Sequence, residues 1–250
     1  MDIHVITIFP GMFPAALSTG IVGRAQDAGL VRVQVHDLRI HTHDRHRTVD
    51  DAPYGGGPGM VMQPGPFFEA VEALGLPYDS PVVLLSPQGK RLTQASAQRL
   101  AMATALVLLC GRYEGVDERV GEHLVTEEIS IGDYVLSGGE LPALVVVDAV
   151  VRLLPGVLGH GEAAIQDDTH TSGLVQYPQY TRPATFREWQ VPGVLLSGDH
   201  AQVARWRRRE ALRRTLERRP DLLARASLSE TDVEELRRLG WTGAQQGTET

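Results

Sequence analysis

The sequence predicts an α/β protein with a mostly parallel sheet, followed by a smaller helical domain. Short apolar runs alternate with segments of helical pattern through residue 154, as in strands joined by crossover helices. Beyond residue 176 these runs give way to two capped helical segments. With 250 residues, 42% of them hydrophobic, the chain is long enough for one sizeable core and a smaller second unit.

The N-terminal residues predict a parallel strand pair. Residues 3–8 are an apolar run that fits a buried strand. A helical pattern follows over residues 13–17 and 21–28, and Gly29 is a good residue to end it. Residues 31–35 alternate between valine and polar side chains, which indicates a second strand. A strand, a helix and a strand in this order predict a right-handed parallel unit.

The alternation continues along the chain. We expect helices over residues 67–74 and 93–102, the second capped by Thr93, and buried strands over residues 82–85 and 106–109. Residues 86–89, Ser-Pro-Gln-Gly, read as a loop that follows a strand.

Residues 107–142 are the stretch most suggestive of a ligand site. Two short apolar runs are each followed by glycine-rich, polar loops, whose glycines are Gly111, Gly115, Gly132, Gly138 and Gly139. Glycine lets the backbone approach a ligand closely, although a glycine after a strand can also be ordinary turn chemistry. Ligands of open α/β sheets collect beyond the carboxyl ends of the strands, so these loops predict one pocket.

Two other polar stretches precede this region. Residues 36–51 are dense in His, Arg and Asp, which fits either metal ligation or a loop that orders over an anionic partner, with Arg45 and Arg47 as contacts. The absence of a clear helix or strand to fix a metal geometry favours the second interpretation. The glycines of residues 54–60 match neither the phosphate-binding P-loop nor the dinucleotide-binding fingerprint.

The C-terminal third changes character. Residues 160–176 are small and polar and predict a flexible linker, which contains Asp167 and Asp168. A helix capped by Asp199 or Ser197 is expected to run through residue 219, and Ser229 can cap a helix over residues 230–239. The tail, residues 242–250, is expected to be disordered.

The charge distribution leaves two interpretations open. The net charge of −7 argues mildly against a nucleic-acid partner, because phosphate contacts need Lys and Arg. Residues 205–219 nevertheless hold eight arginines against two glutamates, and Lys90 is the chain's one lysine. Guanidinium groups pair bidentately with phosphate, so this segment is either an RNA-binding surface or a solvated helix face.

Composition also bounds the cellular setting. The chain has no apolar run of eighteen residues and no signal-peptide pattern, so we expect a soluble cytoplasmic protein without membrane contact. Its single cysteine, Cys110, ends an apolar run and is expected to be a buried, inert thiol.

The motifs of the glycine loops resemble those of a known family. The strings CGRYEGVDERV (residues 110–120) and SIGDYVLSGGELPALVVVDAVVRLLPGVLG (residues 130–159) are similar to the bacterial tRNA (guanine-N1)-methyltransferases of the TrmD family. HDRHRTVDDAPYGGGPGMVM near the front, and YTRPATF and VLLSGDHAQVARWR near the back, extend the resemblance over most of the chain.

This resemblance implies a fold and a reaction. The family belongs to the SPOUT methyltransferases, so loops 86–89, 111–115 and 130–139 would form a deep trefoil knot, which physical reasoning alone would not predict. The implied reaction transfers a methyl group from S-adenosyl-L-methionine to N1 of the guanine at tRNA position 37. The implied partners are tRNA with guanines at positions 36 and 37 and a second copy of the chain, in a homodimer whose active site is shared. Magnesium (Mg2+) dependence is also implied, although the sequence shows no dedicated ligand cage.

The resemblance divides the chain into three parts: a knotted cofactor-binding domain (residues 1–159), a linker that carries the general base (residues 160–176) and a helical tRNA-binding domain (residues 177–250). Methylation at N1 requires a base for the ring proton and a cation for the charge on the guanine oxygen. The family pattern places these roles on Asp168 and Arg152. The cofactor contacts that it implies are Gly111, Ile131, Gly132, Asp133, Tyr134, Val135 and Leu136, and further Pro87, Glu114, Ser130, Gly138, Gly139 and Pro142, with no metal ligand.

Three positions depart from the family pattern. His170 stands where the family usually has Phe, Val175 replaces Leu, and Gln176 replaces an acidic residue. If that acid meets the cofactor's ammonium group, Gln176 brings no charge, and we expect weaker cofactor affinity.

Two other functions remain open on the residues alone. A metal-dependent hydrolase built on residues 36–51 would bind metal tightly and lose activity to a chelator. A non-catalytic RNA-binding protein would use the arginine segment, and its RNA affinity would not depend on Asp168.

Overall fold

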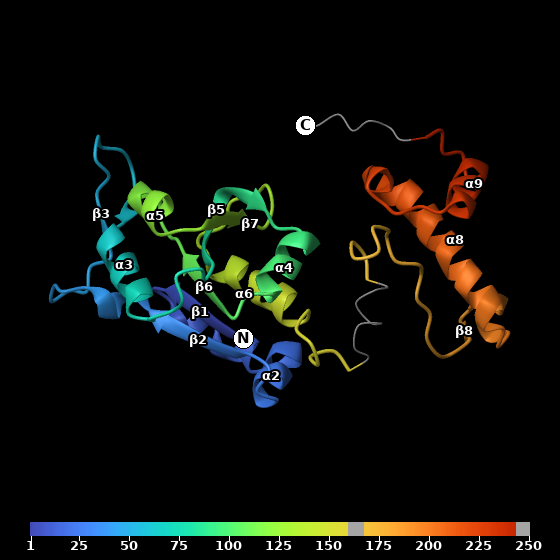
Figure 1. The fold of residues 1–250 in the computed structure, drawn as a ribbon, viewed down its shortest axis with the longest axis horizontal. Helices are drawn as coiled ribbons and strands as arrows, with labels where there is room; N and C mark the ends of the chain where they lie inside the picture. The colour runs from blue at the N-terminus through green and yellow to red at the C-terminus, as the bar shows by residue number, and fades with distance from the viewer. Residues whose placement is uncertain (160–167, 244–250) are drawn as a thin grey trace. The chain divides into compact units, whose positions relative to one another are not determined.

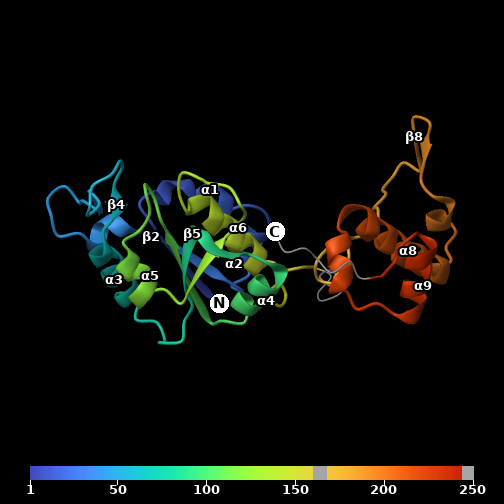
Figure 2. The ribbon, with the colours of Figure 1, turned by 90° about the horizontal axis from the view of Figure 1, so that it is seen from above.

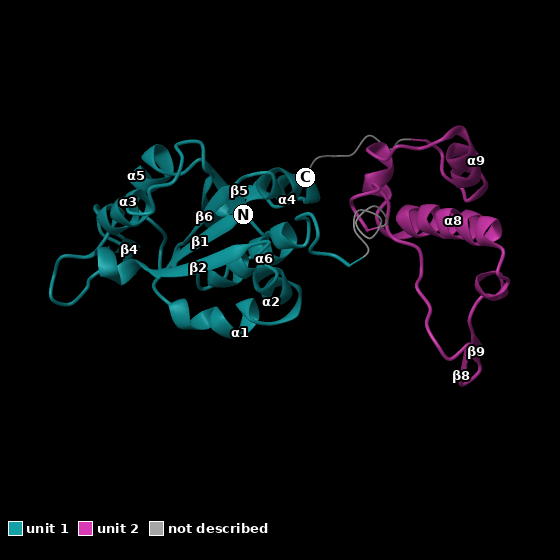
Figure 3. Ribbon diagram, turned by 60° about the horizontal axis from the view of Figure 1, so that its bottom comes forward, with its two compact units in different colours: residues 1–161 teal, residues 162–250 magenta. Residues whose placement is uncertain are grey.

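We describe a computed structural model of the chain, in which residues 1–159 and 168–243 are described. The chain divides into two compact units, residues 1–161 and 162–250 (Figure 3). Each unit is described by itself. The expected disorder of the tail at residues 244–250, and the first half of the expected linker, residues 160–167, lie outside the described residues.

Unit 1 is built on a five-stranded sheet in the order β2-β1-β6-β5-β7 (Figure 1). All four strand pairs are parallel, which confirms the predicted sheet. The strands are β1 (Asp2–Thr7), β2 (Arg32–Asp37), β5 (Val82–Arg91), β6 (Ala105–Cys110) and β7 (Glu127–Ser130). The strand β6 lies inside the sheet and is buried along its whole length, as its continuous apolar sequence requires.

Helices cover both faces of this sheet. Alternate strand residues point to opposite faces, so Ile3 and Val5 pack on one side while Ile6 packs on the other. The first face is covered by α1 (Pro14–Leu17), α2 (Gly20–Asp27), α4 (Gln94–Ala101) and α6 (Glu140–Val151). The second face is covered by α3 (Pro64–Glu72) and α5 (Glu118–His123). These layers confirm the α/β class.

Local signals ended and began the helices as expected. Gly29 follows α2 with a φ of 69°, a left-handed conformation that favours glycine. Thr93 caps α4 by accepting a hydrogen bond from the backbone N–H of Ser96 at 3.2 Å. Short elements connect the layers: η1 (Pro10–Met12), η2 (Leu38–His41), β3 (Asp50–Asp51) and β4 (Val61–Met62).

The strand β5 is longer than predicted. It runs through residues 86–89, which the sequence analysis treated as a loop, and reaches Arg91. Both Leu85 and Lys90 lie opposite Ile129 of β7, so the four residues between them form a bulge in the strand. Gly89 lies against β7 so closely that a Cβ there would meet the backbone carbon of Glu128 at 2.5 Å. Backbone pairing on both sides of the bulge therefore extends the strand beyond its apolar residues.

Unit 2 is helical around a small core. Its helices are α8 (His200–Arg218) and α9 (Glu230–Arg238), with short turns η3 (Gly193–Leu196) and η4 (Pro220–Ala224). Leu212, Leu223 and Leu236 meet in the core, and Asp199 caps α8. A hairpin of β8 (Thr185–Phe186) and β9 (Trp189–Gln190) was not predicted, because two residues per strand are too few to show an alternating pattern.

Asp232 joins the two helices of unit 2. Its carboxylate accepts hydrogen bonds from the Arg208 guanidinium at 2.7 and 2.9 Å and from the backbone N–H of Ser229 at 2.9 Å. Ser229 caps α9 in return, by accepting from the backbone N–H of Asp232. Mainly because of Arg208, the pKa of Asp232 is lowered to about 2 from its usual 3.8.

We predict a pH-dependent loss of stability in unit 2 that Asp232→Asn removes. Because the folded pKa lies below the unfolded pKa, the contribution of Asp232 is present above pH 4 and is lost as the pH falls towards 2. The shift corresponds to about 2 kcal/mol. Urea unfolding followed by the fluorescence of Trp241, which packs at this core, measures it at pH 6 and pH 2.5. Equal pH dependence in the wild type and the variant would contradict this role for Asp232.

None of the helices in the described part of the chain is long and apolar enough to cross a membrane.

Candidate active site

A cavity of about 410 Å³ lies beyond the carboxyl ends of β5, β6 and β7. Its walls come from the bulge of β5 and from the loops that follow β6 and β7, together with Val61 of β4. The volume falls in the range of about 300 to 1,000 Å³ that is usual for small-molecule pockets. The predicted pocket therefore exists, and it is in the predicted place in the sheet.

The glycines let the two loops meet. The backbone N–H of Gly139 donates a hydrogen bond to the backbone oxygen of Gly111 at 2.9 Å, which ties the loop after β7 to the end of β6. A Cβ at Gly139 would lie 2.8 Å from the Cα of Cys110 and 3.1 Å from the backbone nitrogen of Gly111. Neither backbone atom can move away, so this contact excludes every side chain.

A buried ion pair holds the same two loops. The Arg112 guanidinium contacts the Glu140 carboxylate, with Nε at 2.9 Å and Nη2 at 2.8 Å from Oε2. Glu140 is 1% exposed, and its other oxygen accepts a hydrogen bond from the Thr7 hydroxyl at 2.7 Å. Arg112 also lies over the ring of Phe9, with Cζ 4.6 Å from the centroid. The end of β1, the loop after β6 and the start of α6 therefore share one polar contact.

Cys110 lies next to this network and takes no part in it. Its side chain is fully buried, as predicted. Burial, and then the nearby Glu140 charge, raise the pKa of its thiol well above the usual value. Cys110 is therefore not a nucleophile near neutral pH.

The loop after β6 adopts an unusual backbone conformation at the cavity. Tyr113 has a φ of 61°, which is uncommon for a bulky residue and is typical of functional sites. The glycine-rich segment before β4 holds this loop in place: the Glu114 N–H donates to Met60 O at 3.0 Å, and the Met62 N–H donates to Gly115 O at 2.9 Å. The otherwise unclassified glycines of residues 54–60 therefore lead into the cavity wall.

The structure brings together most of the residues that the resemblance implied as cofactor contacts. Twelve of these line the cavity: Pro87, Gly111, Glu114, Ser130, Ile131, Gly132, Tyr134, Val135, Leu136, Gly138, Gly139 and Pro142. The side chain of the remaining one, Asp133, is instead ion-paired with Arg91. Sequence reasoning missed several polar wall residues, among them Ser86, Gln88, Tyr113, Glu118 and Ser137. They stand in the same loops as the glycines, and loop membership was the signal that could have identified them.

The two residues assigned to catalysis lie elsewhere. Arg152 directly follows α6, whose first turn is at the cavity. Ten residues of helix separate it from Pro142, which is about 15 Å at 1.5 Å per residue. Asp168 belongs to unit 2.

The segment that begins at Asp168 is anchored to the helical unit. Leu174 is 1% exposed and packs against Leu212 in the core of unit 2. The backbone N–H of Val175 donates to the Thr215 hydroxyl of α8 at 2.9 Å. Within the segment, the Gln176 N–H donates to the Thr169 hydroxyl at 3.1 Å. Residues 168–176, which the composition assigned to a flexible linker, are therefore held on α8 by specific contacts.

The arginines of α8 fall into two groups. Arg208, Arg209, Arg213 and Arg219 form ion pairs with Asp and Glu side chains of unit 2. The other four, Arg205, Arg207, Arg214 and Arg218, make no ion pair within the described residues. Arg207 lies over the ring of Tyr177, with Cζ 4.9 Å from the centroid, and Arg214 donates to Gln176 O at 3.3 Å. Positive charge thus adjoins the end of the Asp168 segment, but on fewer groups than the sequence suggested.

The histidine-rich segment forms a turn. Asp44 accepts hydrogen bonds from the backbone N–H and the hydroxyl of Thr48, both at 2.8 Å, and these bonds lower the pKa of Asp44. His43 contacts Glu69 at 2.9 Å. No group of three His, Cys, Asp or Glu side chains that could hold a metal ion is found among residues 1–159 and 168–243.

The fold and the cavity define a class: an α/β protein with a small-ligand site of glycine-rich loops at the carboxyl edge of a parallel sheet. Residues 1–225 match the family model described as tRNA (Guanine-1)-methyltransferase TrmD. The chain therefore belongs to this family, and its fold is of the SPOUT type.

Curated relatives agree over almost the whole chain. A tRNA (guanine-N(1)-)-methyltransferase from Moorella thermoacetica is 57% identical over 235 residues, which are 93% of this chain and 94% of that protein. A protein of the same name from Dehalococcoides mccartyi is 56% identical over 234 residues, with 93% and 94% covered. Another, from Chloroflexus aggregans, is 52% identical over 253 residues, with 99% and 98% covered. These findings support tRNA (guanine-N1)-methyltransferase activity for this chain.

Proposed function

We propose that this enzyme transfers a methyl group from S-adenosyl-L-methionine to N1 of the guanine at tRNA position 37. The observation that supports this most is the cavity itself, whose walls contain twelve of the thirteen residues implied as cofactor contacts. When bound, the cofactor supplies an electrophilic methyl group on a sulfonium. The volume suits a nucleoside-sized ligand, and the loops offer backbone groups that can hydrogen-bond an adenine edge.

The chain's own residues would supply the other requirements of the reaction. N1 of guanine carries a proton, which we assign to the Asp168 carboxylate as the acceptor. As that proton leaves, negative charge moves to the guanine oxygen, where we place the Arg152 guanidinium. The methyl group then bonds to N1 as its bond to sulfur breaks. Among the described residues nothing forms a magnesium site, so no step is assigned to that ion.

A homodimer is part of this proposal, because one unit 1 does not hold the whole site. Arg152 follows the end of α6 that is remote from the cavity, so it would serve the cavity of a second copy. Exposed apolar side chains support such a contact: Leu141 and Val145, one turn apart on α6, are 52% and 44% exposed, and Phe9 and Met12 are 42% and 41% exposed. Large exposed apolar side chains of this kind mark protein interfaces.

The division of labour along the chain completes the proposal. Residues 1–159 would form the cofactor-binding domain, which is expected to carry the family's knot. Residues 160–176 would carry the base, and residues 177–250 would bind tRNA. Arg205, Arg207, Arg214 and Arg218 are the candidates for phosphate contacts, because the other arginines of α8 are ion-paired internally. A tRNA substrate is consistent with a cytoplasmic enzyme.

The test is methyl transfer from labelled S-adenosyl-L-methionine to unmodified tRNA with guanines at positions 36 and 37. We expect incorporation that is lost when position 37 is adenine and that withstands extensive dialysis of the enzyme against chelator before assay in magnesium. RNA binding without methyl transfer would favour a non-catalytic RNA-binding protein. Hydrolysis that requires metal but no cofactor would favour the hydrolase.

A further inference from the structure

The hairpin β8–β9 exposes two aromatic side chains at the end of an arm of unit 2. Figure 2 and Figure 3 show it projecting from the helices of this unit. Phe186 is 56% exposed and Trp189 is 66% exposed. Large aromatic side chains are normally buried or placed at interfaces, because each carries 150 to 250 Å² of mostly apolar surface. Two of them together on one projecting hairpin call for a binding partner.

The two rings and an arginine form one continuous surface. Phe186 and Trp189 are directly opposite each other in the antiparallel pair, so both side chains lie on the same face. Their ring centroids are 6.1 Å apart. Arg187, in the turn between them, has its Cζ 5.4 Å from the Phe186 centroid and 5.7 Å from the Trp189 centroid. The result is a patch of flat π surfaces with a positive charge.

Folding of unit 2 does not account for this surface. Residues 181–190 are exposed throughout, and none of them belongs to the core around Leu212. A hairpin with two residues per strand is marginal on its own, and burying these rings would stabilise it. The surface is therefore placed where a partner can reach it.

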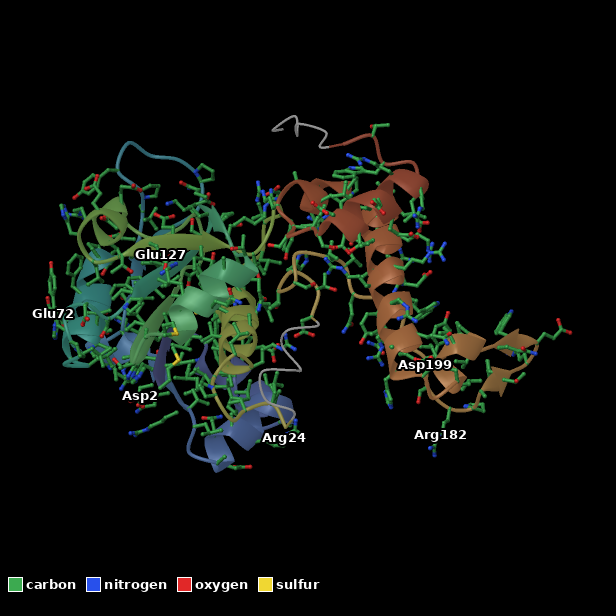
Figure 4. The ribbon with its side chains drawn as sticks, turned by 45° about the vertical axis from the view of Figure 1, so that its right-hand side comes forward. Asp2, Arg24, Glu72, Glu127, Arg182 and Asp199 are labelled. Carbon is green, nitrogen blue, oxygen red and sulfur yellow. The ribbon has the colours of Figure 1, made fainter. Side chains whose placement is uncertain are left out.

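The chemistry of the surface fits an unpaired RNA base. Proteins read single-stranded RNA by stacking its bases on aromatic rings and on guanidinium planes, and this hairpin offers both. Arg182, on the same arm, adds positive charge that suits a phosphate backbone (Figure 4). A protein partner would need a larger apolar patch than two rings around a charged group.

We propose that Phe186, Arg187 and Trp189 form a stacking platform for an unpaired base of the tRNA substrate. This inference rests on the proposed function, because tRNA must be the substrate. The platform contributes to tRNA binding and takes no part in binding S-adenosyl-L-methionine, whose proposed cavity is in unit 1. Its loss therefore weakens tRNA affinity without changing cofactor affinity.

The experiment measures tRNA affinity and steady-state kinetics for the full-length double variant Phe186→Ala/Trp189→Ala. We expect Kd and KM for tRNA to rise about tenfold or more, the effect of one lost base-stacking contact. The kcat at saturating tRNA and the Kd for S-adenosyl-L-methionine are expected to stay unchanged. Tyr78→Ala is the matched control, because Tyr78 is a fully exposed aromatic residue of unit 1 outside the cavity. It should leave all four constants unchanged.

A second measurement reports on the contact directly. With Trp206→Phe and Trp241→Phe, Trp189 is the remaining tryptophan. We expect an anticodon stem-loop to quench its fluorescence, and a blunt RNA duplex of equal length to leave it unchanged, because a duplex has no unstacked base to offer.

Three results would overturn the platform. The first is wild-type tRNA affinity in the double variant with methyl transfer intact, which leaves the proposed function standing. The second is a double variant that sediments as a monomer while the wild type is a dimer, which would make the hairpin a protein contact. The third is a wild-type enzyme that neither binds nor methylates tRNA, which would remove the proposed function as well.

Discussion

The variant Asp168→Asn is expected to lower kcat for methyl transfer by about 10² to 10⁴-fold, the usual contribution of a general base. Asparagine has nearly the same size and shape as aspartate, but it cannot accept the N1 proton of guanine. The segment around Asp168 is anchored to α8 through Leu174 and Val175, so the substitution should leave its position unchanged. Filter binding for tRNA and calorimetry for the cofactor should therefore give wild-type affinities.

Asp167→Asn is the matched control, because it makes the same chemical change one residue earlier in the chain. It is expected to keep kcat within about a factor of three of the wild type. Equal activity in wild type and Asp168→Asn would remove Asp168 from the mechanism, and a loss in Asp167→Asn instead would transfer the role to its neighbour. Mixed dimers of Asp168→Asn with a cofactor-binding variant test the shared site, since activity from two inactive chains requires that each supplies what the other lacks.

The sheet of unit 1 could be predicted from its sequence because burial on both faces writes continuous apolar runs. Residues 105–110 are an example, and each of them is buried. The pocket could be predicted for a related reason, since glycines mark the loops where backbones approach closely. The end of β5 could not be predicted, because its last residues are polar and owe their conformation to pairing with β7.

The catalytic residues are a different case. Nothing in the periodicity distinguishes Asp168 from a solvated linker carboxylate, and only the resemblance to a family singled it out. The positive charge of α8 was overestimated for a physical reason. A count of arginines between residues 205 and 219 omits Asp221, Asp232 and Glu235, which lie farther along the chain and pair with three of them. Ion pairs between helices depend on tertiary structure, which local charge does not show.

Arg112→Met is expected to destabilise unit 1 by about 3 to 5 kcal/mol, because it leaves the Glu140 carboxylate buried without its cation. The Thr7 hydroxyl would be the remaining partner in this network, and one neutral hydrogen bond does not offset the desolvation of a charge. For a unit of this size the loss corresponds to a fall in Tm of roughly 10 °C or more. Differential scanning calorimetry of the full chain measures it.

The double variant Arg112→Met/Glu140→Met separates stability from the placement of the cofactor loops. Removing both charges leaves no buried ion, so most of the lost stability should return. The contact between the loops after β6 and β7 does not return with it, and Arg112 itself lines the cavity. We therefore expect the Kd for S-adenosyl-L-methionine to stay at least tenfold above the wild-type value in the double variant. If cofactor affinity recovered together with Tm, the ion pair would stabilise the fold without positioning the cavity loops.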